Sequence, residues 1–212
     1  MVTNGVDLER FSPGPQLTDV RASLGANGNE ILVVYIGAHG ISHGLAAVVD
    51  AAKSFAPNVR LAFVGEGAEK QMLQQKVAHA GLDNVTFHDG VKREQVSDIL
   101  RSADLLLVPL RDIPLFESFI PSKMFEFMAS GTAIIGSVAG EAAEILEQAG
   151  ATVVKPEDSN QMASAVNHLA SNPQLRKKQS ELGREFVVEN YDRSILATRY
   201  LGELADSAGA RI

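Results

Sequence analysis

The chain has 212 residues, of which 45% are hydrophobic, enough apolar material for the core of one principal globular domain. Its formal net charge of -7 argues against a nucleic-acid-binding protein, whose affinity rests on Lys and Arg side chains that neutralise phosphates. Because it has no cysteine, no apolar run near the roughly 20 residues that cross a bilayer and no N-terminal signal pattern, we expect a disulfide-free, cytoplasmic protein.

The first 29 residues are predicted to form an extended leader rather than a domain. They are rich in Gly, Pro, Asn and Asp, and only residues 17–24 carry a weak helical pattern. Leaders of this kind usually follow something upstream. We therefore interpret residues 1–29 as a linker from a preceding domain.

From residue 30 onward, apolar strands alternate with helices of about ten residues. The run 30–37 is continuous and rich in β-branched residues, as is typical of a strand covered on both faces. This alternation indicates right-handed β-α-β crossovers and an α/β fold with a Rossmann-like, doubly wound parallel sheet of about six strands. The predicted strands are 30–37, 59–64, 85–88, 105–109, 133–137 and 151–154. The predicted helices between them include 45–55, 69–80, 94–102 and 140–149.

The C-terminal third is predicted to be helical, since it contains three helical patterns with no strand between them. Asp158 or Ser159 is expected to cap the first of these helices, and Asn172 the second. We expect these helices to flank the sheet. The patterns cover 160–170, 173–190 and 193–208, and the chain divides into a leader (1–29), a sheet domain (30–190) and a C-terminal helix and tail (191–212).

Ligands of an open α/β sheet bind at the carboxyl ends of its strands, where loops and helix N-termini meet. Four loops are candidates, and three of them contain glycine, which lets a ligand approach the backbone closely. The fourth, residues 111–123, carries functional side chains. The predicted ligand-binding residues of the three glycine loops are His39, Gly40, Gly65, Gly90 and Val91.

The fourth loop is predicted to turn into a helix at Pro121, whose missing N–H suits a first helical turn. Ser122 and Lys123 place a hydroxyl and an ammonium at this helix N-terminus, an arrangement that favours an anion such as a diphosphate. Glu126 lies one turn further on the same face, where its carboxylate can accept hydrogen bonds from paired sugar hydroxyls. Spacing and composition thus predict a nucleotide- or phosphate-binding domain.

Six short motifs follow one another along the chain at regular places in the predicted fold. They are Asn4-Gly5-Val6-Asp7 with Phe11 and Pro13, then Gly37, then Val64-Gly65-Glu66-Gly67, then Val85-Thr86-Phe87 with Gly90, then Ala103-Asp104 with Val108-Pro109, then Glu126-Phe127-Met128-Ala129-Ser130-Gly131. In this order they resemble the C-terminal, donor-binding half of a GT-B glycosyltransferase of the large retaining family 4. The resemblance covers residues 4 to about 204. Residues 120–126 resemble most closely the bacterial branch that makes surface polysaccharides.

This resemblance implies a glycosyltransferase that moves a sugar from a nucleotide sugar, expected to be a UDP-sugar, to a glycan or lipid-linked acceptor. In the family, the motif at residues 4–7 follows the linker from an N-terminal acceptor-binding domain. The chain therefore resembles an isolated donor-binding half, which we expect to bind nucleotide without transferring sugar. The resemblance allows the full-length protein a peripheral contact with the inner face of the membrane. It implies no cofactor beyond the nucleotide-sugar substrate and, without an Asp-X-Asp motif, no metal.

The family usually has two Glu separated by seven residues, the second on the ribose and the first near the donor sugar. Glu126 matches the second, but the first falls on Ser118, and Glu117 lies one residue earlier. Either Ser118 or Glu117 is therefore expected to meet the sugar. Both are candidate catalytic residues.

Many relatives hold the diphosphate with an Arg just after the first strand's glycine and a Lys four to five residues later. The residues at those places here are Ala38 or His39 and Ser42 or His43. The basic function is expected to have moved to Lys123, helped by Arg111. Retaining transfer of this type needs leaving-group stabilisation more than a strong base, which makes Lys123 the third candidate catalytic residue.

Two other classes of function are open at this point. One half of a GT-B nucleotide-sugar epimerase would share the sheet and the nucleotide site, but would work with acid/base groups across the cleft. A non-catalytic, flavodoxin-like binding module would bind none of UDP, GDP and ADP. In every case a small molecule or a protein, and no nucleic acid, is the expected partner.

Overall fold

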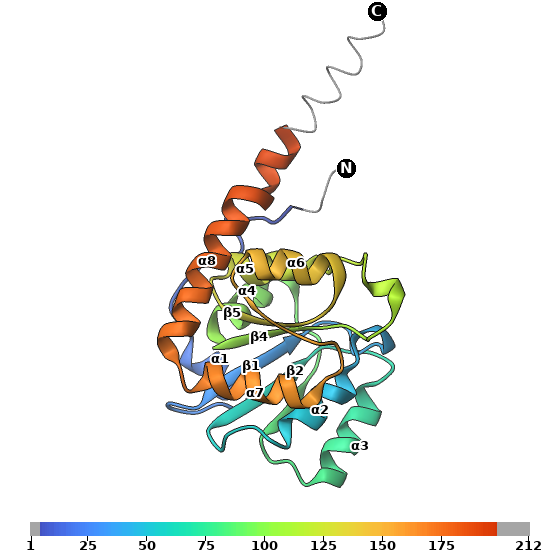
Figure 1. Ribbon diagram of the computed structural model, residues 1–212. Helices are drawn as coiled ribbons and strands as arrows, with labels where there is room; N and C mark the ends of the chain where they lie inside the picture. The colour runs from blue at the N-terminus through green and yellow to red at the C-terminus, as the bar shows by residue number, and fades with distance from the viewer. Residues whose placement is uncertain (1–4, 199–212) are drawn as a thin grey trace, which may run out of the picture.

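Six strands form one sheet in the order β3-β2-β1-β4-β5-β6, and all neighbouring strands pair in parallel (Figure 1). The computed structural model describes residues 5–198. The strand order changes direction between β1 and β4, so the predicted doubly wound sheet of six strands is confirmed. The strands are β1 (Ile31–Ile36), β2 (Val59–Val64), β3 (Val85–His88), β4 (Leu105–Pro109), β5 (Ala133–Ser137) and β6 (Thr152–Val154).

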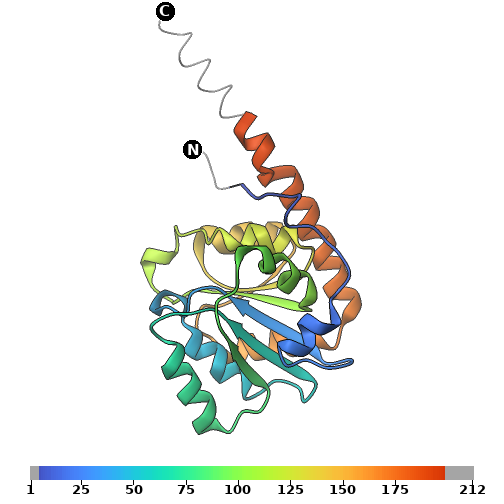
Figure 2. The ribbon, with the colours of Figure 1, turned by 180° about the vertical axis from the view of Figure 1, so that it is seen from behind.

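Helices cover both faces of the sheet (Figure 1, Figure 2). Alternate residues of β1 point to opposite faces, so Leu32 and Val34 join one core while Val33 and Tyr35 join the other. Helices α4, α5 and α6 pack on the first core, and α2, α3 and α7 on the second. The helices are α1 (Thr18–Ser23), α2 (Leu45–Ala52), α3 (Lys70–Ala80), α4 (Arg93–Ser102), α5 (Lys123–Ala129), α6 (Gly140–Gln148), α7 (Ser159–Ala170) and α8 (Pro173–Tyr191), with short turns η1 (Ile41–His43) and η2 (Pro114–Phe116).

The C-terminal helices begin where the sequence predicts. The Asp158 carboxylate caps α7 by accepting a hydrogen bond from the backbone N–H of Asn160, and the Asn172 side chain caps α8. Residues 193–198 are helical, and the rest of the helix predicted at 193–208 lies outside the described residues. Within residues 5–198, no helix has the length and apolar character needed to cross a membrane.

Helix α5 starts at Lys123, two residues later than predicted. The N–H of Met124 donates to the carbonyl of Pro121 at 3.0 Å, and the N–H of Phe125 donates to the carbonyl of Ser122 at 3.2 Å. These bonds span three residues rather than four, so the chain enters the helix through a tighter turn. The helix has only seven residues. It stops before Gly131, as predicted, where the backbone is left-handed with φ +67°.

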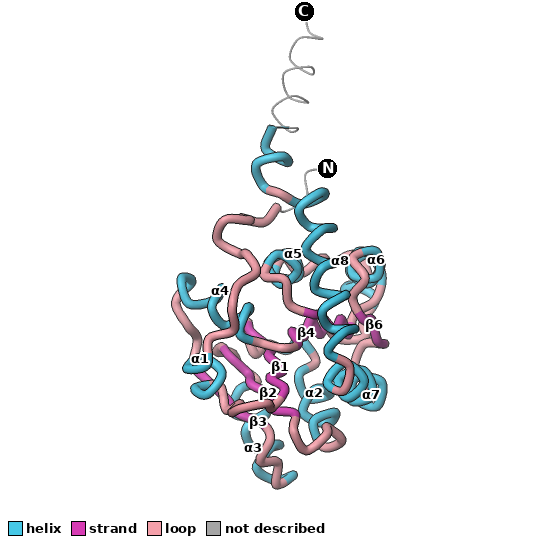
Figure 3. The backbone as a smooth tube through the Cα atoms, turned by 90° about the vertical axis from the view of Figure 1, so that its left-hand side faces the viewer, coloured by secondary structure: helices cyan, strands magenta, loops and turns pink. Residues whose placement is uncertain are grey.

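In the described part of the leader, residues 5–29, turns and irregular segments surround the helix α1, and this part packs on the sheet domain and along α8 (Figure 2, Figure 3). Val6 and Phe11 are each only 2% exposed and belong to the same core as α4, α5 and α6. The N–H of Val6 donates to the carbonyl of Tyr191, and the guanidinium of Arg184 donates to the carbonyl of Phe11. Residues 5–29 therefore share their core with the sheet.

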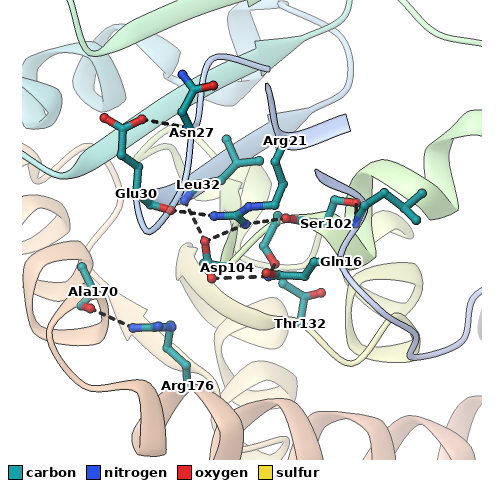
Figure 4. A network of polar contacts seen from close by, with 12 residues as sticks. Gln16, Arg21, Asn27, Glu30, Leu32, Ser102, Asp104, Thr132, Ala170 and Arg176 are labelled. Carbon is teal, nitrogen blue, oxygen red and sulfur yellow. Dashed lines mark hydrogen bonds and ion pairs between the residues drawn. The ribbon is translucent and has the colours of Figure 1, made fainter. Parts of the chain in front are cut away.

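Asp104 links β1 and β4 at the amino ends of these strands (Figure 4). Its carboxylate accepts hydrogen bonds from the N–H of Leu32 at 2.8 Å and from the guanidinium of Arg21 at 2.9 Å, while its own N–H donates to the carbonyl of Leu32. The two charged side chains are only 11% and 13% exposed. Arg21 also donates to the carbonyls of Ser102 and Glu30. This network fastens the leader to the central strands.

We expect the substitution Asp104→Ala to lower the free energy of unfolding by about 2–4 kcal/mol, because it leaves the nearly buried Arg21 guanidinium and the N–H of Leu32 without their acceptor. Urea denaturation measures this change. Asp98→Ala is the matched control, since its ion pair with Arg101 is much more exposed and should contribute about 1 kcal/mol or less. Equal losses in the two variants would contradict a structural role of the network.

Candidate functional site

The four predicted loops meet at the carboxyl ends of the strands, as expected for an open parallel sheet. The N–H of His39, after β1, donates to the carbonyl of Glu66, after β2, at 2.7 Å. The N–H of Gly65 donates to the carbonyl of His88, the last residue of β3, at 3.1 Å. The loop after β4 joins through Arg111, whose N–H donates to the carbonyl of Ser42. Main-chain bonds therefore hold these loops together.

Residue 65 must be a glycine because the loop after β1 packs directly against its backbone. Its φ is +141°, and a Cβ atom there would lie only 2.0 Å from the carbonyl oxygen of Gly37. Gly90 is different, because the nearest heavy atom to such a Cβ is a side-chain atom of Glu66 at 3.8 Å. Gly40 is similarly open, with the His43 ring at 3.8 Å. Gly40 and Gly90 thus leave free space beside the backbone, whereas at Gly65 the loop after β1 occupies the space that a side chain would take.

The side chain of His39 does not reach the surface of the site. It is 0% exposed and lies among the rings of Tyr35, Phe63 and Phe87, with centroid distances of 5.9, 5.9 and 6.2 Å. Neither ring nitrogen has a hydrogen-bond partner among residues 5–198, and burial lowers the pKa of the imidazole, which favours the neutral ring. Its backbone N–H and carbonyl are both used, the carbonyl accepting from the N–H of Glu69. His39 therefore contributes to the core beneath the loops.

Lys123 brings a positive charge to the end of β1. Its Nζ atom lies 4.3 Å above the centroid of the Tyr35 ring and 3.2 Å from where a Cβ atom on Gly37 would stand. Burial lowers the pKa of the ammonium to about 7. Among the described residues, Lys123 has neither a hydrogen bond nor an ion pair through its ammonium. A cation without a paired carboxylate attracts anions.

His43 lies beside this ammonium, half-buried, with its Nδ1 atom 3.2 Å from the hydroxyl of Ser42. Burial, followed by the charge of Lys123, lowers the pKa of His43 to about 4. At pH 7 the ring is therefore neutral. Lys123, whose pKa of about 7 leaves it partly protonated at that pH, is therefore the side chain that carries positive charge at this end of β1.

Glu126 is half-buried one turn further along α5, and burial raises the pKa of its carboxyl group. The charges of Arg93, Arg10 and Arg193 oppose that rise, so three guanidinium groups lie in its neighbourhood. Arg10 also donates to the carbonyl of Arg93, which joins the leader to the start of α4. Sequence reasoning missed these arginines because no local pattern relates residues so distant in the chain.

The remaining predicted residues of the fourth loop differ in their exposure. Pro121 is buried, whereas Ser122, Glu117 and Ser118 are exposed to solvent. The carbonyl of Glu117 accepts a hydrogen bond from the N–H of Glu141 at 2.8 Å, which anchors this loop to the start of α6. The loop thus presents a carboxylate and two hydroxyls on its solvent side.

Two further basic side chains border the site. Arg111 is paired with Glu157 at 3.6 Å, and both side chains are partly exposed. Lys70, which sequence reasoning missed, donates to the carboxylates of Glu66 and Asp89 at 2.8 Å each, and these partners raise its pKa. Lys70 therefore holds the loops after β2 and β3 together. Val91 packs half-buried on the core beside them.

Within residues 5–198, no group of three or more His, Asp or Glu side chains is arranged to hold a metal ion. The side chains gathered at this site can bind an anion and stabilise it electrostatically. Lys123 supplies charge, and Glu126 supplies hydrogen-bond acceptors.

Comparison with known proteins matches residues 18–186 to the family described as glycosyl transferases group 1. The chain is 26% identical over 218 residues to the alpha-maltose-1-phosphate synthase of Mycolicibacterium smegmatis, an alignment that covers 95% of this chain and 55% of that protein. The chain thus spans about half the length of this curated relative.

Solved structures share the fold. The Anabaena protein HepE, in complex with UDP and glucose, superposes with a TM-score of 0.85 at 19% identity, over 97% of this chain and 56% of that one. The C-terminal domain of a glycosyl transferase group 1 family protein, LpcC from Francisella tularensis, superposes with a TM-score of 0.72 at 23% identity. That alignment covers 89% of this chain and 100% of the Francisella domain.

The lowered pKa of Lys123 predicts a pH dependence of stability. Below about pH 7 the side chain is protonated in both states, but between pH 7 and its ordinary pKa of 10.5 only the unfolded chain keeps the proton, so the unfolding free energy rises with pH. The other titratable groups that face Lys123 change their protonation mainly outside this pH range, because burial lowers the pKa of His39 and His43 and raises that of Tyr35.

We therefore expect the stability of the wild type, measured relative to Lys123→Met by urea denaturation, to increase from pH 6.5 to 9.5. The same series with Lys178→Met, which removes an exposed lysine of α8, is the control for loss of a lysine charge. A difference between wild type and Lys123→Met that stays constant over this range would show that the ammonium is not buried.

Proposed function

This chain belongs to the glycosyl transferases group 1 family as the C-terminal domain of a GT-B fold, and we propose that it binds a nucleotide-sugar donor at the carboxyl ends of its strands. The whole protein then transfers the sugar, with retention, to a glycan or a lipid-linked acceptor. The observation that carries this proposal is the ammonium of Lys123 at the end of β1, which no carboxylate of the described residues pairs, with the carboxylate of Glu126 one turn away.

The donor's diphosphate is assigned to Lys123. The loop after β1, where relatives usually carry Arg and Lys, has no basic charge at pH 7 here, because His39 and His43 are neutral. The ammonium of Lys123 reaches this loop from α5 and lies beside Gly37. As the bond to the sugar breaks, negative charge grows on the diphosphate, and a preorganised cation stabilises it.

Ser122 and Arg111 are proposed as further diphosphate contacts. Ser122 is exposed next to Lys123 and makes no side-chain cap on α5, so its hydroxyl can donate to a phosphate oxygen. Arg111 pairs with Glu157 over a long 3.6 Å contact between partly exposed groups, which is a weak interaction that an anion can replace. Pro121 belongs to the turn that carries Ser122 and Lys123.

The nucleoside is assigned to the neighbouring loops. Glu126 would accept hydrogen bonds from the two ribose hydroxyls, and the open backbone at Gly90 and Val91 would meet the base. Uracil is the proposed base, a choice supported by the UDP that the fold relative HepE binds. The sugar would then extend toward the fourth loop, where Glu117 or Ser118 contacts it.

Calorimetric titration with UDP, GDP and ADP tests the proposal, and UDP is expected to bind. Glu126→Ala should weaken UDP binding at least about ten-fold, because it removes a charged acceptor from the ribose. Glu144→Ala, which removes an exposed glutamate of α6, is the matched control and should bind like the wild type.

Unchanged affinity in Glu126→Ala would refute the ribose assignment, and binding of none of the three nucleotides would refute donor binding. Because the chain spans about half of its relative, we further expect it to transfer no sugar alone. Sugar transfer from a UDP-sugar to any acceptor by these 212 residues would contradict that expectation.

A further inference from the structure

Tyr35 is the one polar side chain in a strand of aliphatic residues. Strand β1 reads Ile-Leu-Val-Val-Tyr-Ile, and Tyr35 is 0% exposed in the core that it shares with its register partner Phe63. A buried phenol needs a hydrogen-bond partner, which an aliphatic residue or a phenylalanine would not. Packing alone therefore does not explain a tyrosine at this position.

Both ends of the Tyr35 side chain act on the site. Its hydroxyl donates to the carbonyl of Ala38 at 2.6 Å, which fixes the loop that follows β1. Its ring lies beneath the ammonium of Lys123, with 4.3 Å between Nζ and the ring centroid. A cation at this distance is attracted by the negative face of the ring. One residue of β1 thus holds both the loop and the cation that arrives from α5.

The group that holds the Lys123 ammonium affects how well the ammonium can bind an anion. A carboxylate beside Lys123 would hold the ammonium but would also neutralise it toward an incoming diphosphate. An aromatic face attracts the cation without carrying a net charge, and the nearby rings of His39 and His43 are neutral at pH 7. Lys123 is therefore held in place without a carboxylate that would neutralise it, and an incoming diphosphate raises its pKa above about 7, which favours the charged form.

We propose that Tyr35 is the positioning residue of the site, which holds the ammonium of Lys123 at the end of β1 so that its N–H groups meet the donor's diphosphate. This inference rests on the proposed function, because it assigns a diphosphate to Lys123. The contact between the ring and the ammonium nevertheless exists without any nucleotide, so the two can be tested separately.

The first test needs no ligand. Protons above an aromatic ring resonate at lower frequency because of the ring current, so the ε-methylene protons of Lys123 are expected to be shielded in NMR spectra of the free protein. Tyr35→Phe keeps this shielding and Tyr35→Leu abolishes it. Phe63→Leu, which shortens the register partner of Tyr35 in the same core, leaves it unchanged. Unshielded Lys123 protons in the wild type would overturn the proposal.

The second test measures UDP affinity by calorimetry. Tyr35→Leu should weaken binding about ten-fold, within the range expected for loss of a cation–π contact. Tyr35→Phe should restore most of the affinity, because its ring still supports the ammonium. In the Lys123→Met background, Tyr35→Leu should weaken binding no more than Tyr35→Phe does, since both lack the hydroxyl and the ammonium that the ring positions is absent.

The outcomes separate the inference from the function on which it rests. If no nucleotide binds the wild type, the proposed function fails, whatever the NMR spectra show. If UDP binds but Tyr35→Leu weakens it equally with and without Lys123, the positioning role is refuted. An equal loss in Phe63→Leu would also refute it, because a general loosening of the core would then explain the effect.

Discussion

The pairing of β1 with β4 is the constraint on which the rest of the structure depends. Val33 lies opposite Leu105, and Asp104 binds the backbone of Leu32 through both its main chain and its carboxylate. The helices that follow the two strands, α2 and α5, pack on opposite faces of the sheet. Because these helices diverge, the carboxyl ends of both strands are left to loops. The ammonium of Lys123 can therefore reach β1 from α5.

The electrostatics of this edge differ from those of the whole chain. The protein is acidic overall, yet at the end of β1 it holds an ammonium supported by an aromatic ring rather than by a carboxylate. Charges withdrawn from water are normally paired, and partial burial lowers the pKa of the half-buried Lys123 ammonium. Local rules of stability are most often broken where a ligand supplies the missing partner, which agrees with the proposed diphosphate site.

Much of the fold could be predicted because the central strands β1 and β4 are continuous apolar runs buried on both faces, and because Asp158 and Asn172 cap their helices through local hydrogen bonds. The start of α5 could not be predicted. The carbonyls of Pro121 and Ser122 accept hydrogen bonds from residues three positions further on, so the α-helix begins only at Lys123. Local propensity does not distinguish these two ways of entering a helix.

The sequence by itself determined the order of strands and helices, the family motifs and the candidate loops, because periodicity and short motifs are local properties of the chain. Only the tertiary structure decided what each side chain can do. His39 turns inward among rings from three strands, Arg10 and Arg93 approach Glu126, and Tyr35 meets Lys123. Most of these residues come from segments far apart in the chain. The burial that shifts the pKa values of His39, Lys123 and Glu126 arises only when those segments pack together.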